Sequence, residues 1–551
     1  MVRRRSLLLV AAIVAWMGAA AMSRPSARQS AAAADPHAAA PGVTFETSDN
    51  CLACHNGLTA PSGEDVSIGV AWRASMMANA SRDPYWQAGV RRETIDHPER
   101  AAFIEDECAI CHMPMARTLA QAAGGTGEVF GLAPGSGDSE AHQFAADGVS
   151  CTLCHQIGPE RLGTRESFVG GFVIGEPVEG GPRIFGPFEV TEGRQALMRS
   201  ATGVQPTEAT HVEQSEMCAT CHTLITEAFG PGGEVIGSLP EQVPYQEWQH
   251  SAFAADRSCQ SCHMPVVADT AISSVVGEPR ERLARHTFLG GNFFMLRMLN
   301  LFRDELDVIA PPDELDAAAQ ATIRQLAADT AEVAVARAAL TGGRLELDVR
   351  VGNLTGHKLP TGYPSRRAWL HVVVRDGQGR AVFESGAVSD TGAIAGNDND
   401  ADAGRFEPHH TEIRSADQVQ IYEAIMAEPD GSVTTGLLRA TQYLKDNRLL
   451  PRGFDKRTAP VEIAVRGAAM ADGDFTGDGD LVRYRIEPGT ASGPFQVEAT
   501  LRYQTIAYRW AENLRPYEAF EPARFVRYWD AMKASSSVEL GRAATTIVPA
   551  P

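Results

Sequence analysis

Cysteine and histidine recur together at one spacing in this chain. Each of its 10 cysteines belongs to a Cys-x-x-Cys-His segment. Two thiols about one helical turn apart lie on one face of a helix and can reach the two vinyl groups of one porphyrin. The spacing therefore predicts five sites of covalent haem attachment, with the following histidine as the proximal iron ligand. The segments are CLACH at 51–55, CAICH at 108–112, CTLCH at 151–155, CATCH at 218–222 and CQSCH at 259–263.

Two other uses of paired cysteines explain the pattern less well. A disulfide framework leaves the histidine after every pair unexplained. Zinc needs two such pairs for each ion, which would leave one pair over. We therefore assign the cysteines to thioether bonds and the motif histidines to iron. The cysteines are Cys51, Cys54, Cys108, Cys111, Cys151, Cys154, Cys218, Cys221, Cys259 and Cys262, and the histidines are His55, His112, His155, His222 and His263.

The sixth ligand of each iron is expected among the remaining histidines. Five of these lie within the motif-bearing stretch, which matches five irons and predicts bis-histidine, low-potential centres. His142 and His250 each lie nine residues before the first cysteine of a motif, which favours them. The turn-like Asp96-His97-Pro98 argues against His97. Met76 and Met77 are alternative thioether ligands, although such residues more often serve in packing. The five candidates are His97, His142, His211, His250 and His286.

The N-terminus has the features of an export signal. Three arginines precede an apolar run at 7–22, which is short for a membrane span and suits a signal peptide over residues 1–36. No other stretch is apolar enough to cross a bilayer, so the mature protein is expected to be periplasmic, extracellular or on the cell surface. The net charge of −20 argues against nucleic acid and anionic membranes as partners.

Hydrophobic periodicity changes along the chain and predicts two domains. A pentahaem domain of short helices and loops is expected over 43–304, followed by a linker helix within 305–330. Because so few side chains could fill its core, the haem domain should not fold without haem. Alternating strands in 331–551 predict an antiparallel β-sandwich-like domain with a helix near 522–533. The expected strands are 331–340, 344–351, 368–375, 381–385, 418–426, 461–466, 481–486 and 495–504.

An acidic loop in the second domain has some features of a calcium site. Four aspartates surround Gly477, but Arg483 stands where a bidentate glutamate is expected. A solvated turn is the alternative, and the acidic run 397–404 has the same two interpretations. The four candidate ligands are Asp472, Asp474, Asp478 and Asp480.

The flanks of the motifs resemble exported multihaem c-type cytochromes, distant relatives of the nitrification tetrahaem cytochrome and of pentahaem nitrite reductase. The similar phrases include SMMANASRDPYWQAGVRRE, IEDECAICHMPMA, RHTFLGGN, NLTGHKLPTGYPSRRAWLHV and YLKDNRLLPRGF. The resemblance implies close-packed haems with a β-domain docked on them. It makes His357, in GHKLPTG, a candidate iron ligand in place of His97, and it raises a weaker possibility for His409 and His410. The lysine-ligated haem motif of the nitrite reductases is absent from this sequence.

These features favour an electron carrier with unknown donor and acceptor proteins. The alternative is an oxidoreductase in which one open haem acts on a small nitrogen or sulfur compound. Tyr363, Arg366 and Arg367 could line such a site, although strand-edge packing explains them too. A haem filament is a third possibility that nothing in the sequence selects.

Overall fold

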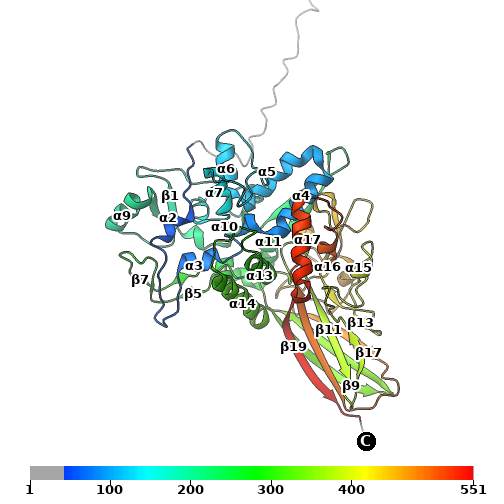
Figure 1. The fold of residues 1–551 in the computed structure, drawn as a ribbon. Coiled ribbons are helices and arrows are strands. Elements are labelled where there is room, and N and C mark those ends of the chain that lie inside the picture. Colours follow the sequence, from blue (N-terminus) through cyan, green and yellow to red (C-terminus); the bar gives the residue numbers. More distant parts are fainter. Residues whose placement is uncertain (1–41, 550–551) are drawn as a thin grey trace, which may run out of the picture. The chain divides into compact units, whose positions relative to one another are not determined.

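Short helices joined by long loops make up the first part of the computed structural model, which describes residues 42–549 (Figure 1). The predicted signal peptide lies outside the described residues. Each Cys-x-x-Cys-His segment lies on or beside a helical turn, as its spacing requires. The helices before residue 304 are α2 (Ser48–Leu52), α3 (Ile68–Arg73), α4 (Pro84–Asp96), α5 (Ala101–His112), α6 (Pro114–Ala122), α7 (Glu140–Ala146), α8 (Cys151–Cys154), α9 (Glu192–Thr202), α10 (Ser215–Ala219), α11 (Pro244–Gln249), α12 (Cys259–His263) and α13 (Phe293–Leu301).

The start of α4 shows how local sequence sets these helices. Asp83 caps it by accepting hydrogen bonds from the backbone N–H groups of Tyr85, at 2.8 Å, and Trp86, at 3.1 Å. Pro84 occupies the first turn, where its missing N–H costs nothing. The cap places Trp86 on the first turn of α4, where it faces the end of α5.

Small two-stranded sheets brace the loops of this part. β1 (Arg183–Gly186) and β2 (Gln205–Glu208) pair in parallel. β3 (Leu224–Phe229) and β4 (Val235–Gln242) form an antiparallel hairpin. The remaining short pairs are β5 (Val266–Val267) with β8 (Leu283–Ala284) and β6 (Thr270–Ala271) with β7 (Pro279–Arg280).

Helix α14 (Pro312–Asp329) leads into two larger sheets. One has the strand order β13-β17-β10-β9, and the other has the order β12-β11-β18-β19 with β14 paired to β11. All neighbours in these sheets are antiparallel except β13 and β17. The strands are β9 (Ala331–Thr341), β10 (Arg344–Asn353), β11 (Arg367–Arg375), β12 (Ala381–Ser385), β13 (Glu412–Ile413), β14 (Ile421–Tyr422), β17 (Asp480–Ile486), β18 (Phe495–Gln504) and β19 (Ser537–Ile547).

Strand β10 follows the alternation expected from its sequence. Leu345, Leu347, Val349 and Val351 are fully buried, while the residues between them are not. Buried side chains of β11 and β18 belong to the same hydrophobic cluster. The two sheets therefore share one core, which agrees with the predicted antiparallel sandwich-like packing.

Two predicted strands have a different structure. The segment 418–426 divides between β14 and β15 (Ala424–Ala427), and β15 pairs with β16 (Gln442–Asp446) outside the main sheets. The segment 461–466 begins with a 3₁₀ turn instead of a strand. Both segments are rich in apolar residues, and a loop that packs on the core can bury such residues as well as a strand can.

The expected separation into two domains is not confirmed, because the C-terminal part contacts the motif-bearing part extensively. Helix α17 (Phe520–Met532), shown in red, runs beside α4 (Figure 1). Arg91 of α4 forms a bidentate ion pair with Glu521, with distances of 2.7 and 2.9 Å. Phe294 of α13 packs edge-on against Trp529 with ring centroids 5.8 Å apart. Two further helices complete this part, α15 (Asp398–Ala401) and α16 (Tyr508–Glu512).

Candidate functional site

Most motif histidines donate a hydrogen bond from Nδ1 to a backbone carbonyl oxygen. Nδ1 of His55 donates to Ile272 O at 2.6 Å, Nδ1 of His112 to Ala80 O at 3.0 Å, and Nδ1 of His155 to Phe185 O at 2.6 Å. His263 makes the same kind of bond to Leu289. A neutral imidazole with its proton on Nδ1 leaves the Nε2 lone pair free for a metal ion. The site is therefore oriented for ligation through Nε2.

Burial keeps two of the motif imidazoles, those of His112 and His222, neutral. It lowers the pKa of His112 to about 4, against the opposite effect of the bond to Ala80. Burial also lowers the pKa of His222 to about 4, with smaller contributions from His263 and Arg366. A neutral ring is the form that binds a metal ion, so no proton competes with the metal near neutral pH.

Two motif histidines face a second histidine from a distant segment. The ring centroids of His155 and His286 are 6.2 Å apart, with the ring planes 23° from parallel. His263 and His357 are also 6.2 Å apart, with the planes at 15°. Two imidazoles bound through nitrogen to opposite sides of one metal, at about 2.0 Å each, have centroids roughly 6.3 Å apart. The spacing fits one iron between each pair.

The two partner histidines are oriented in the same way as the motif histidines. His286 donates from Nδ1 to Ala284 O at 3.0 Å, and His357 donates from Nδ1 to Lys358 O at 2.9 Å. Each ring therefore keeps Nε2 free to bind a metal ion that lies between it and the motif histidine. His286 and His357 are the two sequence candidates that the structure brings against a motif histidine.

The remaining candidates lie elsewhere. His142 is half-buried with Nδ1 2.7 Å from Ser139 Oγ, and the exposed His250 donates to Gln246 O at 2.8 Å. His211 is buried, but its Nε2 is bonded to Ile157 O at 2.8 Å. In the described part of the chain, none of these rings pairs with a motif histidine at the spacing found for His286 and His357.

His97 is buried at 4% exposure, and neither ring nitrogen has a hydrogen-bond partner among the described residues. Its ring meets the edge of Phe229 at a centroid distance of 5.8 Å. It follows the last residue of α4, roughly 16 Å along the axis from Trp86 at the rise of an α-helix. Since Trp86 stacks on His112 with centroids 4.2 Å apart, His97 lies away from the iron expected there.

Cysteines of different motifs lie side by side. The Cys51 thiol is hydrogen-bonded to Cys151, and this bond lowers the pKa of Cys51. Cys221 has the same relation to Cys111, and Cys259 to Cys218. The fourth motif therefore contacts both the second and the fifth, and its Cys221 also interacts with Cys154 of the third. The motifs form one cluster whose spatial order differs from their order in the chain.

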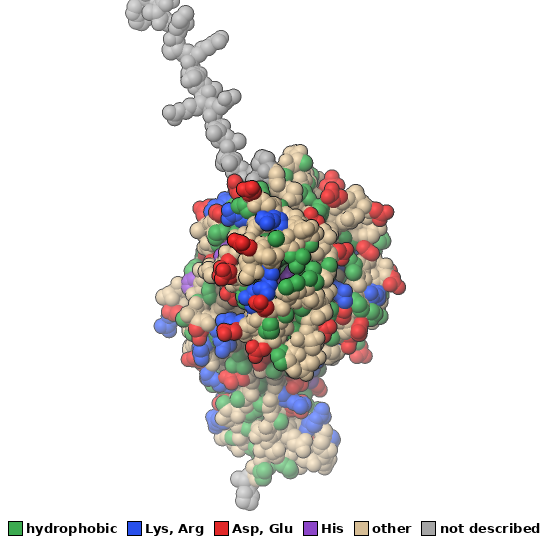
Figure 2. All heavy atoms as spheres, turned by 90° about the vertical axis from the view of Figure 1, so that its left-hand side faces the viewer, with side chains coloured by type: hydrophobic (Ala, Val, Ile, Leu, Met, Phe, Trp, Pro, Cys, Tyr) green, Lys and Arg blue, Asp and Glu red, His purple; other side chains and the backbone are tan. Residues whose placement is uncertain are grey.

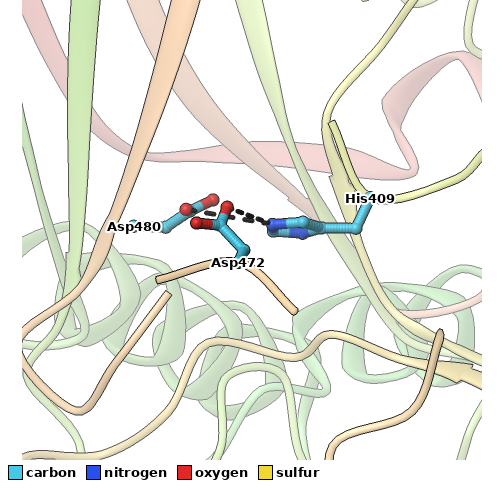
Figure 3. A group of neighbouring side chains, drawn as sticks. All are labelled: His409, Asp472 and Asp480. Carbon is cyan, nitrogen blue, oxygen red and sulfur yellow. Dashed lines mark hydrogen bonds and ion pairs between the residues drawn. The ribbon is translucent and has the colours of Figure 1, made fainter. Parts of the chain in front are cut away.

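The structure gathers a second set of potential metal ligands in the C-terminal part (Figure 3). His409 Nε2 lies 3.1 Å from Asp472 Oδ2 and 4.0 Å from Asp480 Oδ1, and all three side chains are buried. Asp474 instead pairs with Arg483, and Asp478 is exposed. Two of the four predicted calcium ligands thus lie together, and the calcium assignment stays a prediction.

Hydrogen bonds around His409 argue against its use as a metal ligand. The amides of Gln420 and Asn447 both present nitrogen to Nδ1, at 2.8 and 3.0 Å. Their oxygens are committed to backbone N–H groups, those of His410 and Glu423. Nδ1 must therefore accept, which puts the proton of neutral His409 on Nε2, facing Asp472. A metal at Nε2 would have to displace that proton.

The pocket residues suggested for an enzyme have other partners. Arg367 is buried and holds Asp400 with two hydrogen bonds of 2.8 and 2.9 Å. Tyr363 packs edge-on against Trp510 with centroids 5.3 Å apart. Arg366 donates to Thr361 O at 2.7 Å and contributes to the electrostatics of His222. Arg366 alone among the three adjoins a motif histidine.

Sequence reasoning missed residues that contact a motif histidine or its partner. Trp86 stacks on His112 with planes 3° from parallel, and Glu247 and Lys358 lie beside His357. Lys358 follows His357 directly in the GHKLPTG phrase, which was the available signal. No spacing rule connects Glu247 to that phrase.

The Cys-x-x-Cys-His segments therefore fit c-type haem attachment, and two of them face a second imidazole. Within residues 42–549, no helix is both long and apolar enough to cross a bilayer. A similar solved structure is the penta-heme cytochrome c552 from Thermochromatium tepidum. It has a TM-score of 0.49 and 15% sequence identity, and the match covers 93% of this chain and 100% of that chain. No protein-family model matches this chain. No curated protein matches it.

Proposed function

We propose that this protein is an exported multihaem c-type cytochrome that transfers electrons through five covalently attached haems. The observation that carries the proposal is the pair of imidazole sandwiches, His155 with His286 and His263 with His357, each with centroids 6.2 Å apart. In each pair, one imidazole belongs to a Cys-x-x-Cys-His motif and the other comes from a distant segment. Haem c supplies one-electron chemistry at each site.

The contacts between motifs support a carrier. Thiols from different motifs touch, so the groups that they hold would lie edge to edge. The fourth motif adjoins three others and is the centre of this arrangement. Proximity of this kind is what passage of electrons between sites needs.

The partners are proposed to be soluble or surface redox proteins. The chain carries a net charge of −20, which disfavours nucleic acid and anionic membranes. On the face shown in Figure 2, acidic and basic side chains are interspersed without a field of one sign. An extended basic or acidic docking patch is therefore not expected on that face.

An oxidoreductase with one open haem is the second candidate, and one observation favours it. Among the described residues, His55, His112 and His222 have no second imidazole at the spacing of the two pairs. His222 also lies near the cation of Arg366. An open iron beside a cation could bind a small anion.

One measurement separates the two candidates. The oxidised holoprotein is studied by EPR and visible spectroscopy with and without cyanide, after a pyridine haemochrome assay of haem per chain. Five haems with only low-spin signals that cyanide leaves unchanged would support the carrier. A high-spin signal lost on adding cyanide would support the enzyme. Fewer than five covalent haems would contradict the motif assignment.

A further inference from the structure

His357 is held at both ends of its residue. Its carbonyl accepts from Asn353 Nδ2 at 2.7 Å and from Thr355 Oγ1 at 2.9 Å. Its Nδ1 donates to Lys358 O at 2.9 Å. These partners are the last residue of β10 and residues of the loop between β10 and β11. The direction of the imidazole therefore depends on what anchors that loop.

Lys358 is the anchor point of the loop. Its side chain is 0% exposed, and Nζ lies 2.7 Å from Asp446 Oδ2. Its backbone N–H donates to Glu247 Oε2 at 3.1 Å. The backbone of Lys358 thus connects two residues, because its N–H donates to Glu247 and its carbonyl accepts from His357.

Glu247 lies on α11, in the segment that leads to the fifth motif at 259–263. Its carboxylate is fully buried and also accepts from Thr361 Oγ1 at 2.6 Å. Arg448 Nη1 lies 2.9 Å from Glu247 Oε1. Every one of these partners comes from the C-terminal part of the chain. One carboxylate therefore ties the segment before His263 to the loop that carries His357.

The charges around this carboxylate balance. Arg448 holds Asp446 with two hydrogen bonds of 2.9 and 2.8 Å, and Asp446 holds Lys358. Two cations and two carboxylates thus form one buried cluster. Burial would raise the pKa of Asp446, but the attraction of Arg448 and Lys358 outweighs it and holds the pKa well below its usual range. Removing Glu247 leaves a buried cation uncompensated.

The loop also packs directly on this segment. A Cβ atom added at Gly356 would lie 3.4 Å from Trp248 and from Phe253. The backbone N–H of Ala252 donates to Arg452 O at 2.7 Å. The loop that carries His357 is therefore in direct contact with the residues that follow Glu247.

We propose that Glu247 is a positioning residue that, through Lys358, holds His357 at the spacing from His263 needed to share one iron. This inference rests on the proposed function, because it assumes haem at the fifth motif. If it is correct, contacts between the two parts of the chain determine whether His357 can bind the iron of that haem.

The test compares matched variants of the full-length holoprotein by EPR, visible spectroscopy and cyanide titration. Glu247→Ala should give a high-spin signal and cyanide binding at one haem, as His357→Ala does. Glu247→Gln keeps an oxygen that can accept from Lys358 and should give a smaller signal. Asp400→Asn is the control, because it also removes a buried carboxylate from an arginine but lies away from His357. It should lower thermal stability without changing the spectrum.

The outcomes separate the inference from the proposed function. In the His357→Ala background, Glu247→Ala should add no further high-spin haem, because both changes act on one ligand. If Glu247→Ala lowers stability with an unchanged spectrum, Glu247 is only structural and the inference fails. If His357→Ala itself leaves all haems low-spin, the ligand pair in the proposed function fails. If Glu247→Ala yields no holoprotein, Thr361→Val takes its place with the same expectations.

Discussion

The imidazoles of His263 and His357 lie 6.2 Å apart, centroid to centroid, with planes only 15° from parallel. One belongs to helix α12 and the other to the loop after β10, so different parts of the chain supply the two sides of one site. Because the two histidines come from different segments, a single substitution can remove either one without changing the other.

Removing either partner histidine should open one iron. We expect His286→Ala and His357→Ala each to convert one of five haems from low-spin to high-spin, because each loses an axial nitrogen. EPR of the oxidised protein measures this, and cyanide should abolish the new signal.

Two histidines serve as controls for that experiment. His142 is half-buried and His250 is exposed, and the hydrogen bonds of both rings are to residues three or four positions away. His142→Ala and His250→Ala should leave the spectra unchanged. A new high-spin signal in either variant would show that the sixth ligands are distributed differently.

Trp86 should contribute to stability through its stacking on His112. It is half-buried, so Trp86→Ala is expected to lower the free energy of unfolding by about 2 kcal/mol, less than for a fully buried tryptophan. Trp86→Phe retains a stacking ring and should recover part of the loss. Denaturant unfolding of the holoproteins measures both, and equal losses for Ala and Phe would argue against stacking as the cause.

Loss of the fourth motif should cost more haem than loss of the first. Cys218 and Cys221 are hydrogen-bonded to cysteines of the fifth and second motifs and interact electrostatically with Cys154 of the third, whereas the thiol partner found for Cys51 among the described residues is Cys151 of the third. Replacing the fourth pair by alanine should therefore reduce covalent haem by more than one per chain. Mass spectrometry counts the haems, and the Cys51→Ala/Cys54→Ala variant, expected to lose a single haem, is the comparison.

The cluster of His409, Asp472 and Asp480 should leave opposite marks on the pH dependence of stability. Burial raises the pKa of Asp480 to about 7, so its folded state holds a proton that the unfolded state has released, and stability falls as pH rises from about 4 to about 7. Burial lowers the pKa of His409 to about 4, so stability rises over about pH 4 to 6.5. The two effects largely cancel in the wild-type protein.

Substitution should expose each effect in turn. In Asp480→Asn the His409 effect remains, and stability should rise with pH between about 4 and 6.5, by at most about 1.4 kcal/mol per pH unit. In His409→Gln it should fall over the same range. Denaturant melts across this range measure the slopes. Equal slopes in both variants would mean that the two groups are not the ones that titrate.

The alternation of apolar and polar residues predicted some strands correctly and failed for others. In β10 one face is buried and the other is not, so a period of two appears in the residues themselves. β19 was missed, although it forms a long edge strand paired with β18. Its sequence, SVELGRAATTI, mixes small and polar residues because only alternate positions touch the core. The segment 461–466 was predicted as a strand from its apolar residues, yet it begins with a 3₁₀ turn in which Ile463 is buried and Val461 is exposed.

The same division holds at the site. The sequence by itself predicted where haem would be attached, because both thiols and the histidine lie within about one helical turn and need no tertiary contact to come together. It also suggested His286 and His357, but it favoured His142 and His250, which the structure does not pair with a motif histidine. Only the tertiary structure decided the pairing, because a second axial imidazole must come from a distant segment, and its distance depends on contacts such as Glu247 with Lys358 that no local spacing encodes.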